Sequence, residues 1–199
     1  MRIKESSLKF ILSVIAAVVL FSVLSAFVCR SPETCTYDRF SVRTLTDVDA
    51  EKVNISPKII TIGQLMSFNQ VFPVDKKFNK DARYGNEFNT YQVYCKIKEY
   101  KKDNNGTYRM ILMDLNDTAI TMIAEIPNPN CDGVSVSKFA NSYGMTRTMF
   151  EKFISGDGHG VLSGTYNMTG VCFFDKIKGD YSAPNGVCLS PIVDLEKFR

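Results

Sequence analysis

The sequence predicts a mainly β fold: a five-stranded barrel with one helix between strands 3 and 4, preceded by an N-terminal transmembrane or signal helix. Three observations support this prediction. An uncharged apolar run opens the chain, apolar and polar residues alternate with period two from about residue 86, and helical spacing interrupts that alternation near residue 140. The 199-residue length leaves enough chain after the apolar run for one domain with a buried core.

The apolar run extends from Phe10 to Val28 and is flanked by Lys9 and Arg30. At about 1.5 Å per residue, a helix of this length crosses roughly the hydrocarbon thickness of a bilayer. We therefore favour an uncleaved anchor within residues 1–29, with a cleaved secretory signal and a buried core helix as the alternatives. Basic residues concentrate before the run, so the following domain is expected on the extracytoplasmic side of the cell membrane. If the segment is cleaved, the domain is secreted.

Residues 30–85 lack sustained periodicity and contain three prolines. We interpret them as an extended lead-in with short elements. Ile59 to Ile62, followed by Gly63, is the best candidate for a short strand, and Asp75 to Arg83 for a surface loop.

Residues 86–199 contain the predicted barrel. Tyr91 to Ile97 alternate as a first strand, and the turn from Asp103 to Gly106 ends in Asn-Gly, which favours positive φ. Tyr108 to Met113 then forms the returning strand of a hairpin, and Ile120 to Ile126 alternates as the third strand. These three segments predict an antiparallel meander.

The helix follows the third strand, with Ser137 as its expected N-cap and Gly156 as its stop. Its apolar positions have helical spacing: Phe139, Tyr143, Phe150 and Ile154. Thr165 to Phe174 and Val187 to Leu195 supply the last two strands. Three strands, a helix and two strands is the order of an OB-fold, and a β-sandwich is the alternative architecture.

Six cysteines, an even number, are consistent with an oxidising compartment and predict disulfides. We favour Cys172–Cys188 because both lie on the final strands, which leaves Cys95–Cys131 and Cys29–Cys35. Thiolate metal binding is the rival interpretation. The usual zinc spacings are absent, since the chain has no C-x-x-C and His159 is its only histidine. We predict neither a metal nor another cofactor.

Charge and motifs argue against several functions. The formal net charge is only +3, and no segment has the basic excess of a phosphate-binding surface, so nucleic acid is an unlikely partner. Common nucleophile, zincin and nucleotide motifs are missing, and His159 has the setting of a surface loop residue between glycines. No catalytic residue is assigned from motifs.

Several segments form recognisable motifs: Thr169 to Asp175 together with Ala183 to Ile192, which is the most specific, and also Thr121 to Pro127, Cys131 and Arg43 to Asp47. In these segments the chain resembles an uncharacterised family of secreted bacterial proteins with no established activity. The chain departs from the family pattern where chemistry matters most. Histidines of the family are replaced by Arg109, Lys178 and Ser190, and a carboxylate is replaced by Cys188. Any site formed by those family residues is therefore not expected here.

Six residues remain as binding candidates: Glu125, Phe173, Phe174, Asp175, Lys178 and Asn185. The two carboxylates could do paired acid–base work, although a solvated strand residue and a turn-capping side chain are the simpler interpretations. The phenylalanines and lysine border a loop that could hold a base or a sugar.

The favoured hypothesis is a membrane-anchored, noncatalytic binding or envelope-structural module. Its expected partners are the membrane, through residues 10–28, and a protein or oligosaccharide ligand. The alternative is a degenerate or metal-dependent hydrolase that uses Glu125 and Asp175.

Overall fold

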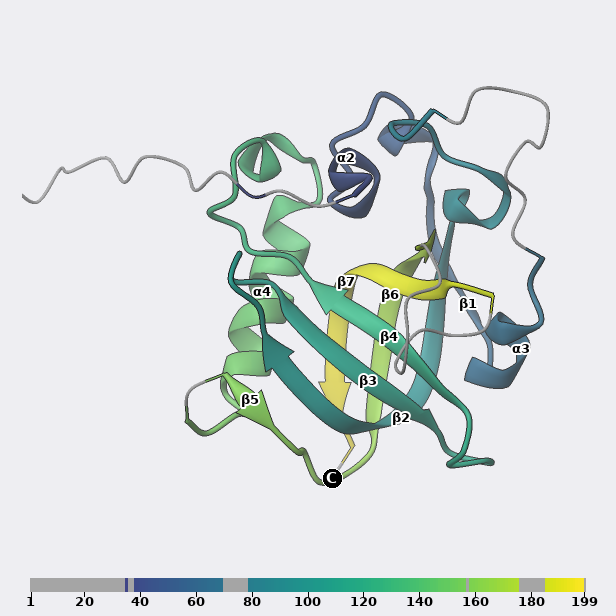
Figure 1. Cartoon of the computed structure of the whole chain (residues 1–199), viewed down its shortest axis with the longest axis vertical. Helices are drawn as coiled ribbons and strands as arrows, with labels where there is room; N and C mark the ends of the chain where they lie inside the picture. Colours follow the sequence, from purple (N-terminus) through teal and green to yellow (C-terminus); the bar gives the residue numbers. More distant parts are fainter. Residues whose placement is uncertain (1–34, 36–37, 70–78, 157, 176–184, 199) are drawn as a thin grey trace, which may run out of the picture. The chain divides into compact units, whose positions relative to one another are not determined.

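The computed structural model describes residues 35, 38–69, 79–156, 158–175 and 185–198 (Figure 1). The segment before the barrel contains α2 (Phe40–Arg43), η1 (Ala50–Lys52), β1 (Asn54–Ile59), α3 (Ile62–Met66) and η2 (Gly85–Phe88). The remaining elements are β2 (Asn89–Lys102), β3 (Tyr108–Asp114), β4 (Thr121–Ile126), η3 (Val134–Val136), α4 (Ala140–Glu151), β5 (His159–Gly160), β6 (Tyr166–Phe174) and β7 (Val187–Lys197).

Five strands close into a barrel, which confirms the predicted mainly β architecture. Strands β2, β3 and β4 form an antiparallel meander, β4 pairs with β7 in parallel, and β7 pairs with β6 in antiparallel fashion. The barrel closes because β2 is long enough to pair twice. Its first half pairs with β6 and its second half with β3, with a bulge between Ile97 and Glu99 where the strand bends. The one long helix, α4, lies between the third and fourth barrel strands as expected.

The barrel interior is apolar, as the alternation predicted. The inward residues of β2 are buried, whereas its outward residues Lys96 and Lys98 are exposed. The buried inward residues are Tyr91, Val93, Cys95 and Ile97. Helix α4 contributes Phe150 to the same core, where its ring lies 5.4 Å from that of Tyr100 and 5.0 Å from that of Tyr108, centroid to centroid. These aromatic contacts join the helix to the barrel.

Two local expectations were wrong. The expected strand from Ile59 to Ile62 is divided, because β1 ends at Ile59 and Ile62 begins α3. Thr61 forms a capping box with Gln64, a pairing that starts a helix and was overlooked in the sequence. Ser137 is also not the N-cap of α4, which is Phe139. The Ser137 hydroxyl instead donates to the Leu45 carbonyl at 2.9 Å and so connects to the lead-in.

The hairpin turn was correctly predicted. Gly106 has φ +77°, and the Asp103 carboxylate accepts hydrogen bonds from the backbone N–H groups of Asn105 and Thr107 at 3.0 and 2.9 Å. The turn therefore has the Asx and positive-φ chemistry that its sequence indicates.

The described part of the chain contains no helix with the length and apolarity needed to cross a membrane. The expected anchor or signal segment, residues 1–29, lies outside the described residues.

Candidate functional site

A second, smaller apolar cluster lies on the outer surface of the barrel. It consists of Val42 from α2, Ile123 from β4, Phe173 from β6 and Cys188 from β7, all buried. Helix α2 therefore covers the outer faces of these strands, which would otherwise be solvated. Both faces of the strands are buried at this position. This packing sets the environment of Glu125, which lies two residues after Ile123 on the same face.

Arg43, at the end of α2, joins the two carboxylates that the sequence singled out. Its Nη1 donates to Glu125 Oε2, and its Nη2 lies 2.5 Å from Asp175 Oδ2. The three side chains are 7%, 8% and 12% exposed, so the ion pairs are largely removed from water. Glu125 does not match its simpler sequence interpretation, because it is buried and not solvated, and Asp175 is paired with an arginine.

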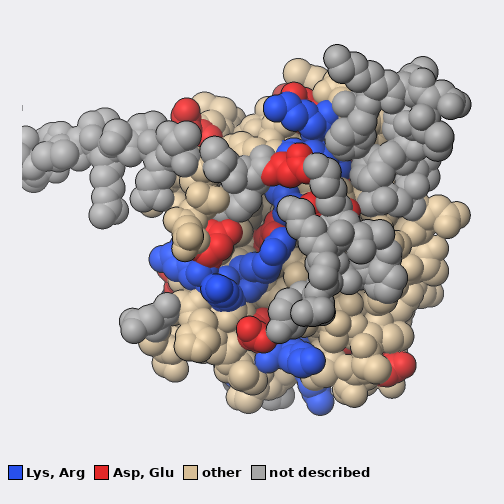
Figure 2. All heavy atoms as spheres, in the orientation of Figure 1, with Lys and Arg blue, Asp and Glu red and all other residues tan. Residues whose placement is uncertain are grey.

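Two further residues complete the polar contacts of Glu125. The Ser190 hydroxyl donates to Oε2 at 3.0 Å, and Arg109 Nε donates to Oε1 at 3.1 Å. Arg109 Nη2 also lies 3.7 Å from Asp175 Oδ2, while half of the Arg109 side chain remains exposed. Figure 2 shows basic and acidic side chains side by side on the face that bears β3 and β4. Glu125 is thus held by two guanidinium groups and one hydroxyl.

A neighbouring arginine, Arg39, binds Glu87 through both of its terminal nitrogens, at 2.5 and 2.7 Å. Glu87 is completely buried and also accepts from the Phe174 backbone N–H at 2.9 Å. The guanidinium carbons of Arg39 and Arg43 lie 4.9 and 4.3 Å from the centroid of the Phe173 ring. Phe173 is therefore packed among arginines from the lead-in.

A third buried pair secures the same segment. Arg83 binds Asp47 through Nε at 3.1 Å and Nη2 at 2.6 Å, and both side chains are fully buried. Arg83 also donates to the carbonyls of Val42 and Glu87, at 2.8 and 3.1 Å. Bidentate geometry with additional carbonyl acceptors is how a buried arginine is fully satisfied.

Electrostatics within this cluster keep Arg43 charged. Burial alone disfavours the charged guanidinium, but the attraction of Glu125, with a smaller contribution from Asp175, outweighs it and raises the pKa of Arg43. The pKa of the Cys188 thiol is raised well above its usual value, first by burial and then by the charge of Glu125. Cys188 is consequently a neutral packing residue and not a thiolate nucleophile.

A small pocket adjoins this cluster. Arg43, Thr44, Thr107, Glu125 and Ser190 line it, with Phe40, Pro127 and Cys131, and its volume is about 10 Å³. A space of this size holds about one water molecule, and Glu125 and Ser190 supply polar groups in walls that are mostly apolar. It is too small for a substrate.

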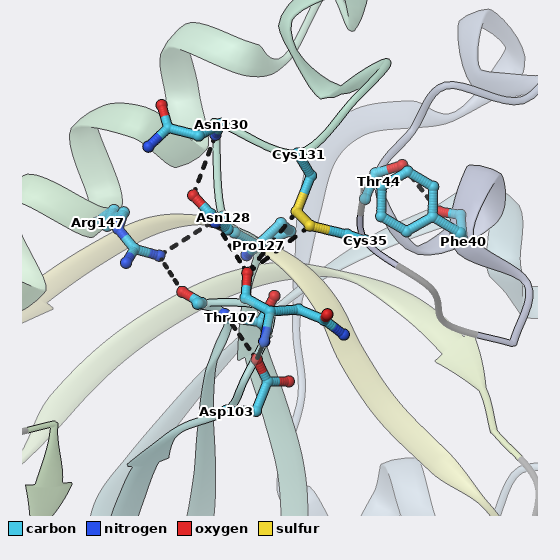
Figure 3. The surroundings of a disulfide bond; sticks show 12 residues. Cys35, Phe40, Thr44, Asp103, Thr107, Pro127, Asn128, Asn130, Cys131 and Arg147 are labelled. Carbon is cyan, nitrogen blue, oxygen red and sulfur yellow. Dashed lines mark hydrogen bonds between the residues drawn. A yellow bond between two sulfur atoms is a disulfide. The ribbon is translucent and has the colours of Figure 1, made fainter. Parts of the chain in front are cut away.

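The disulfide pairing differs from all three expected pairs. Cys35 is bonded to Cys131, with the Cα atoms 5.5 Å apart, and Cys95, Cys172 and Cys188 are free and buried (Figure 3). The expected Cys172–Cys188 pair was wrong because Cys172 belongs to the barrel interior and Cys188 to the outer cluster, on opposite sheet faces. Cys29 lies outside the described residues.

The disulfide contacts the β2–β3 turn. Both sulfur atoms lie 3.8 Å from the Asn105 carbonyl oxygen, to which the Asn128 side chain donates at 2.8 Å (Figure 3). Arg147 of α4 donates to the Gly106 carbonyl at 2.8 Å. The lead-in, the turn and the helix therefore meet at this bond.

Of the other candidate residues with described positions, Phe173 packs against Arg43 at this cluster, whereas Phe174 and Asn185 lie elsewhere. Phe173 and Phe174 are both buried, so neither ring is exposed to stack on a base or a sugar. The Asn185 side chain donates to the carbonyls of Leu65 and Phe68, at 3.1 and 3.0 Å, and so holds the end of α3. Lys178 lies outside the described residues. Among the residues with described positions, no group of three or more potential ligands could hold a metal.

Sequence reasoning missed Arg39, Arg43 and Arg83, which supply the cations of all three buried pairs. Their segment lacks periodicity, so it gave no indication that it packs on the barrel. One signal was available: Arg43 to Asp47 belongs to the segments of family resemblance, and both of its charged residues turn out to be buried.

No protein-family model matches the chain, and no curated protein and no solved structure shows a significant similarity to it.

Proposed function

We propose that the chain is an extracytoplasmic, membrane-anchored and noncatalytic binding or envelope-structural module built on an OB-fold-like barrel. One observation carries the proposal: Glu125 and Asp175 are both committed to the buried guanidinium of Arg43. A general acid or base must lie within hydrogen-bond distance of the substrate atom whose proton it transfers. These carboxylates contact the protein's own arginines instead.

The strand order supports the OB-fold assignment. A closed barrel in which the third and fifth strands are parallel, with a helix after the third, matches the connectivity of that small Greek-key barrel. The Cys35–Cys131 disulfide supports an oxidising compartment.

The departures from the resembled family support the loss of an ancestral site. Arg109 and Ser190, which replace histidines, both bind Glu125, and Cys188 packs beside them. Substituted positions from two distant strands, β3 and β7, thus meet around one carboxylate. In this chain the position has the chemistry of a structural clamp between α2 and the barrel.

The alternative, a degenerate or metal-dependent hydrolase, has one observation in its favour. Glu125 and Asp175 converge on Arg43, and Glu125 lines a pocket with room for about one water.

Hydrolysis assays with the purified full chain separate these functions. Fluorogenic ester, glycoside, phosphate and peptide substrates are tested with and without divalent metal ions, on the natural protein and on Glu125→Gln. The noncatalytic function predicts no turnover by either protein. Turnover that Glu125→Gln abolishes, with an unchanged circular dichroism spectrum, would establish the hydrolase.

A further inference from the structure

We propose that the outer surface of β5, β2 and β3 binds the anionic groups of an acidic oligosaccharide. The site is the basic row, which consists of His159, Lys101 and Arg109. This inference rests on the proposed binding function and identifies its ligand class.

The strand register places the three residues in line. His159 of β5 is the direct partner of Lys101 in β2, and Lys101 is the direct partner of Arg109 in β3. Directly opposed residues in antiparallel strands project from the same face. That face is the outer one, because the preceding residues, Tyr100 and Tyr108, are buried in the barrel core. With strands about 4.8 Å apart, the basic row extends over about 10 Å.

All three members of the basic row are exposed, and they keep donors available. Arg109 directs Nε and Nη2 toward Glu125, which leaves Nη1 without a partner among the described residues. Within those same residues, the Lys101 ammonium and the His159 imidazole form no hydrogen bond or ion pair. Each member can therefore donate to an anion without breaking an internal contact.

The arrangement leaves the Lys101 ammonium without a compensating carboxylate among the described residues. Like charges directly opposite one another destabilise a strand pair, and Lys101 lies directly opposite Arg109. Two carboxylates are near. Glu125 is the direct cross-strand partner of Arg109 and lies 3.1 Å from its Nη2, so it compensates Arg109 as well as buried Arg43. Glu99, two residues before Lys101, lies opposite Ile111. Figure 2 shows basic side chains gathered over this part of the sheet.

The chemistry of the surface favours an acidic oligosaccharide over a nucleic acid. Single-stranded nucleic acids bind through exposed aromatic rings as well as cations, and the aromatic residues next to the basic row, Tyr100 and Tyr108, are only 2% and 4% exposed. Repeated carboxylates on a sugar chain need only ammonium, guanidinium and imidazole donors spaced along the surface. Such polymers are also accessible to an extracytoplasmic domain.

The test uses the full-length chain in an uncharged detergent at low ionic strength, titrated calorimetrically with oligogalacturonate, which has one carboxylate per sugar. Parallel titrations use an uncharged galactose oligomer of equal length and a single-stranded oligothymidylate. The variants are Lys101→Glu, Lys101→Gln and His159→Ala. Lys58→Glu, on exposed β1, is the matched control because it makes the same charge change away from the basic row.

We expect oligogalacturonate to bind, with affinity reduced about tenfold or more in Lys101→Glu, less in Lys101→Gln and His159→Ala, and little in Lys58→Glu. Equal losses in Lys101→Glu and Lys58→Glu, or no binding of oligogalacturonate, would refute the site. Tighter, Lys101-dependent binding of oligothymidylate would replace the oligosaccharide with a nucleic acid and also refute the proposal. Binding of the uncharged oligomer that no variant affects would refute the basic row while leaving the proposed binding function intact.

Discussion

Arg43 and Glu125 are 82 positions apart in the sequence and form a buried ion pair that attaches α2 to β4. The pair extends to Asp175 at the end of β6, so one guanidinium connects three segments of the chain. Buried ion pairs contribute little relative to an apolar replacement of both partners, but removing one partner leaves the other charge uncompensated. Arg43 is therefore a sensitive position for testing this clamp.

Replacing Arg43 by methionine is expected to lower the free energy of unfolding by about 3–5 kcal/mol, because Glu125 and Asp175 lose their buried cation and keep only the half-exposed Arg109. Urea denaturation followed by circular dichroism measures the change. Lys52→Met removes an ion pair to Asp49 whose lysine is 71% exposed, and it should leave the midpoint unchanged. An equally small effect of both substitutions would mean that the carboxylates are already solvated.

The Cys35–Cys131 bond closes a loop with a sequence separation of 96. Replacing both cysteines by serine should lower the free energy of unfolding by about 4–5 kcal/mol, since the crosslink restricts the unfolded chain. Denaturation in the presence and absence of a reductant measures it. The reductant should destabilise the natural protein and have no effect on the double variant. If reduction leaves the natural protein unaffected, the bond is not formed in solution.

The barrel was more predictable than the site for a physical reason. Strands such as β2 alternate between core and solvent, so Tyr91, Val93 and Ile97 indicated their positions directly. By contrast, Glu125 and Arg43 depend on contacts between segments of different character, and only one of these segments has periodicity. The cysteines show the same difference. The Cys172–Cys188 pair was inferred because these residues lie on neighbouring strands. The observed Cys35–Cys131 bond forms because the lead-in packs beside the β4–α4 connection.

Buried thiols give the protein a specific alkaline sensitivity. Burial, assisted by the charge of Asp114, raises the pKa of Cys95 from 9.0 to about 12, and burial also raises that of Cys172. Between these values the unfolded thiol loses its proton while the folded thiol keeps it, so the unfolded state binds fewer protons. Stability is then fully present below pH 9 and falls as pH rises toward 12, by about 1.4 kcal/mol per pH unit for each thiol.

Denaturation midpoints between pH 8 and pH 11 test this sensitivity, with Cys95→Ala as the comparison. The cavity left by the substitution lowers stability at every pH. The decrease of stability with pH above pH 9 should be less steep in the variant than in the natural protein. Identical slopes would show that Cys95 does not control the alkaline loss. Iodoacetamide at pH 8 should leave Cys95 and Cys172 unmodified in the folded protein and label both in urea, because reaction requires an exposed thiolate.

Two glycine positions should respond to alanine in opposite directions. Gly106 has φ +77°, and an added Cβ would lie 2.7 Å from Asn128 Nδ2, the group that supports the turn beside the disulfide. Gly106→Ala is therefore expected to destabilise the protein by more than about 1 kcal/mol, through backbone strain and displacement of Asn128. Gly144 lies inside α4, and an added Cβ would meet no atom within 4 Å apart from its chain neighbours and the backbone of the helix itself. Gly144→Ala should stabilise the protein by about 0.5–1 kcal/mol, because alanine favours the helix. Thermal denaturation of both variants measures the two effects. A stabilising Gly106→Ala would contradict the positive-φ geometry of the β2–β3 turn.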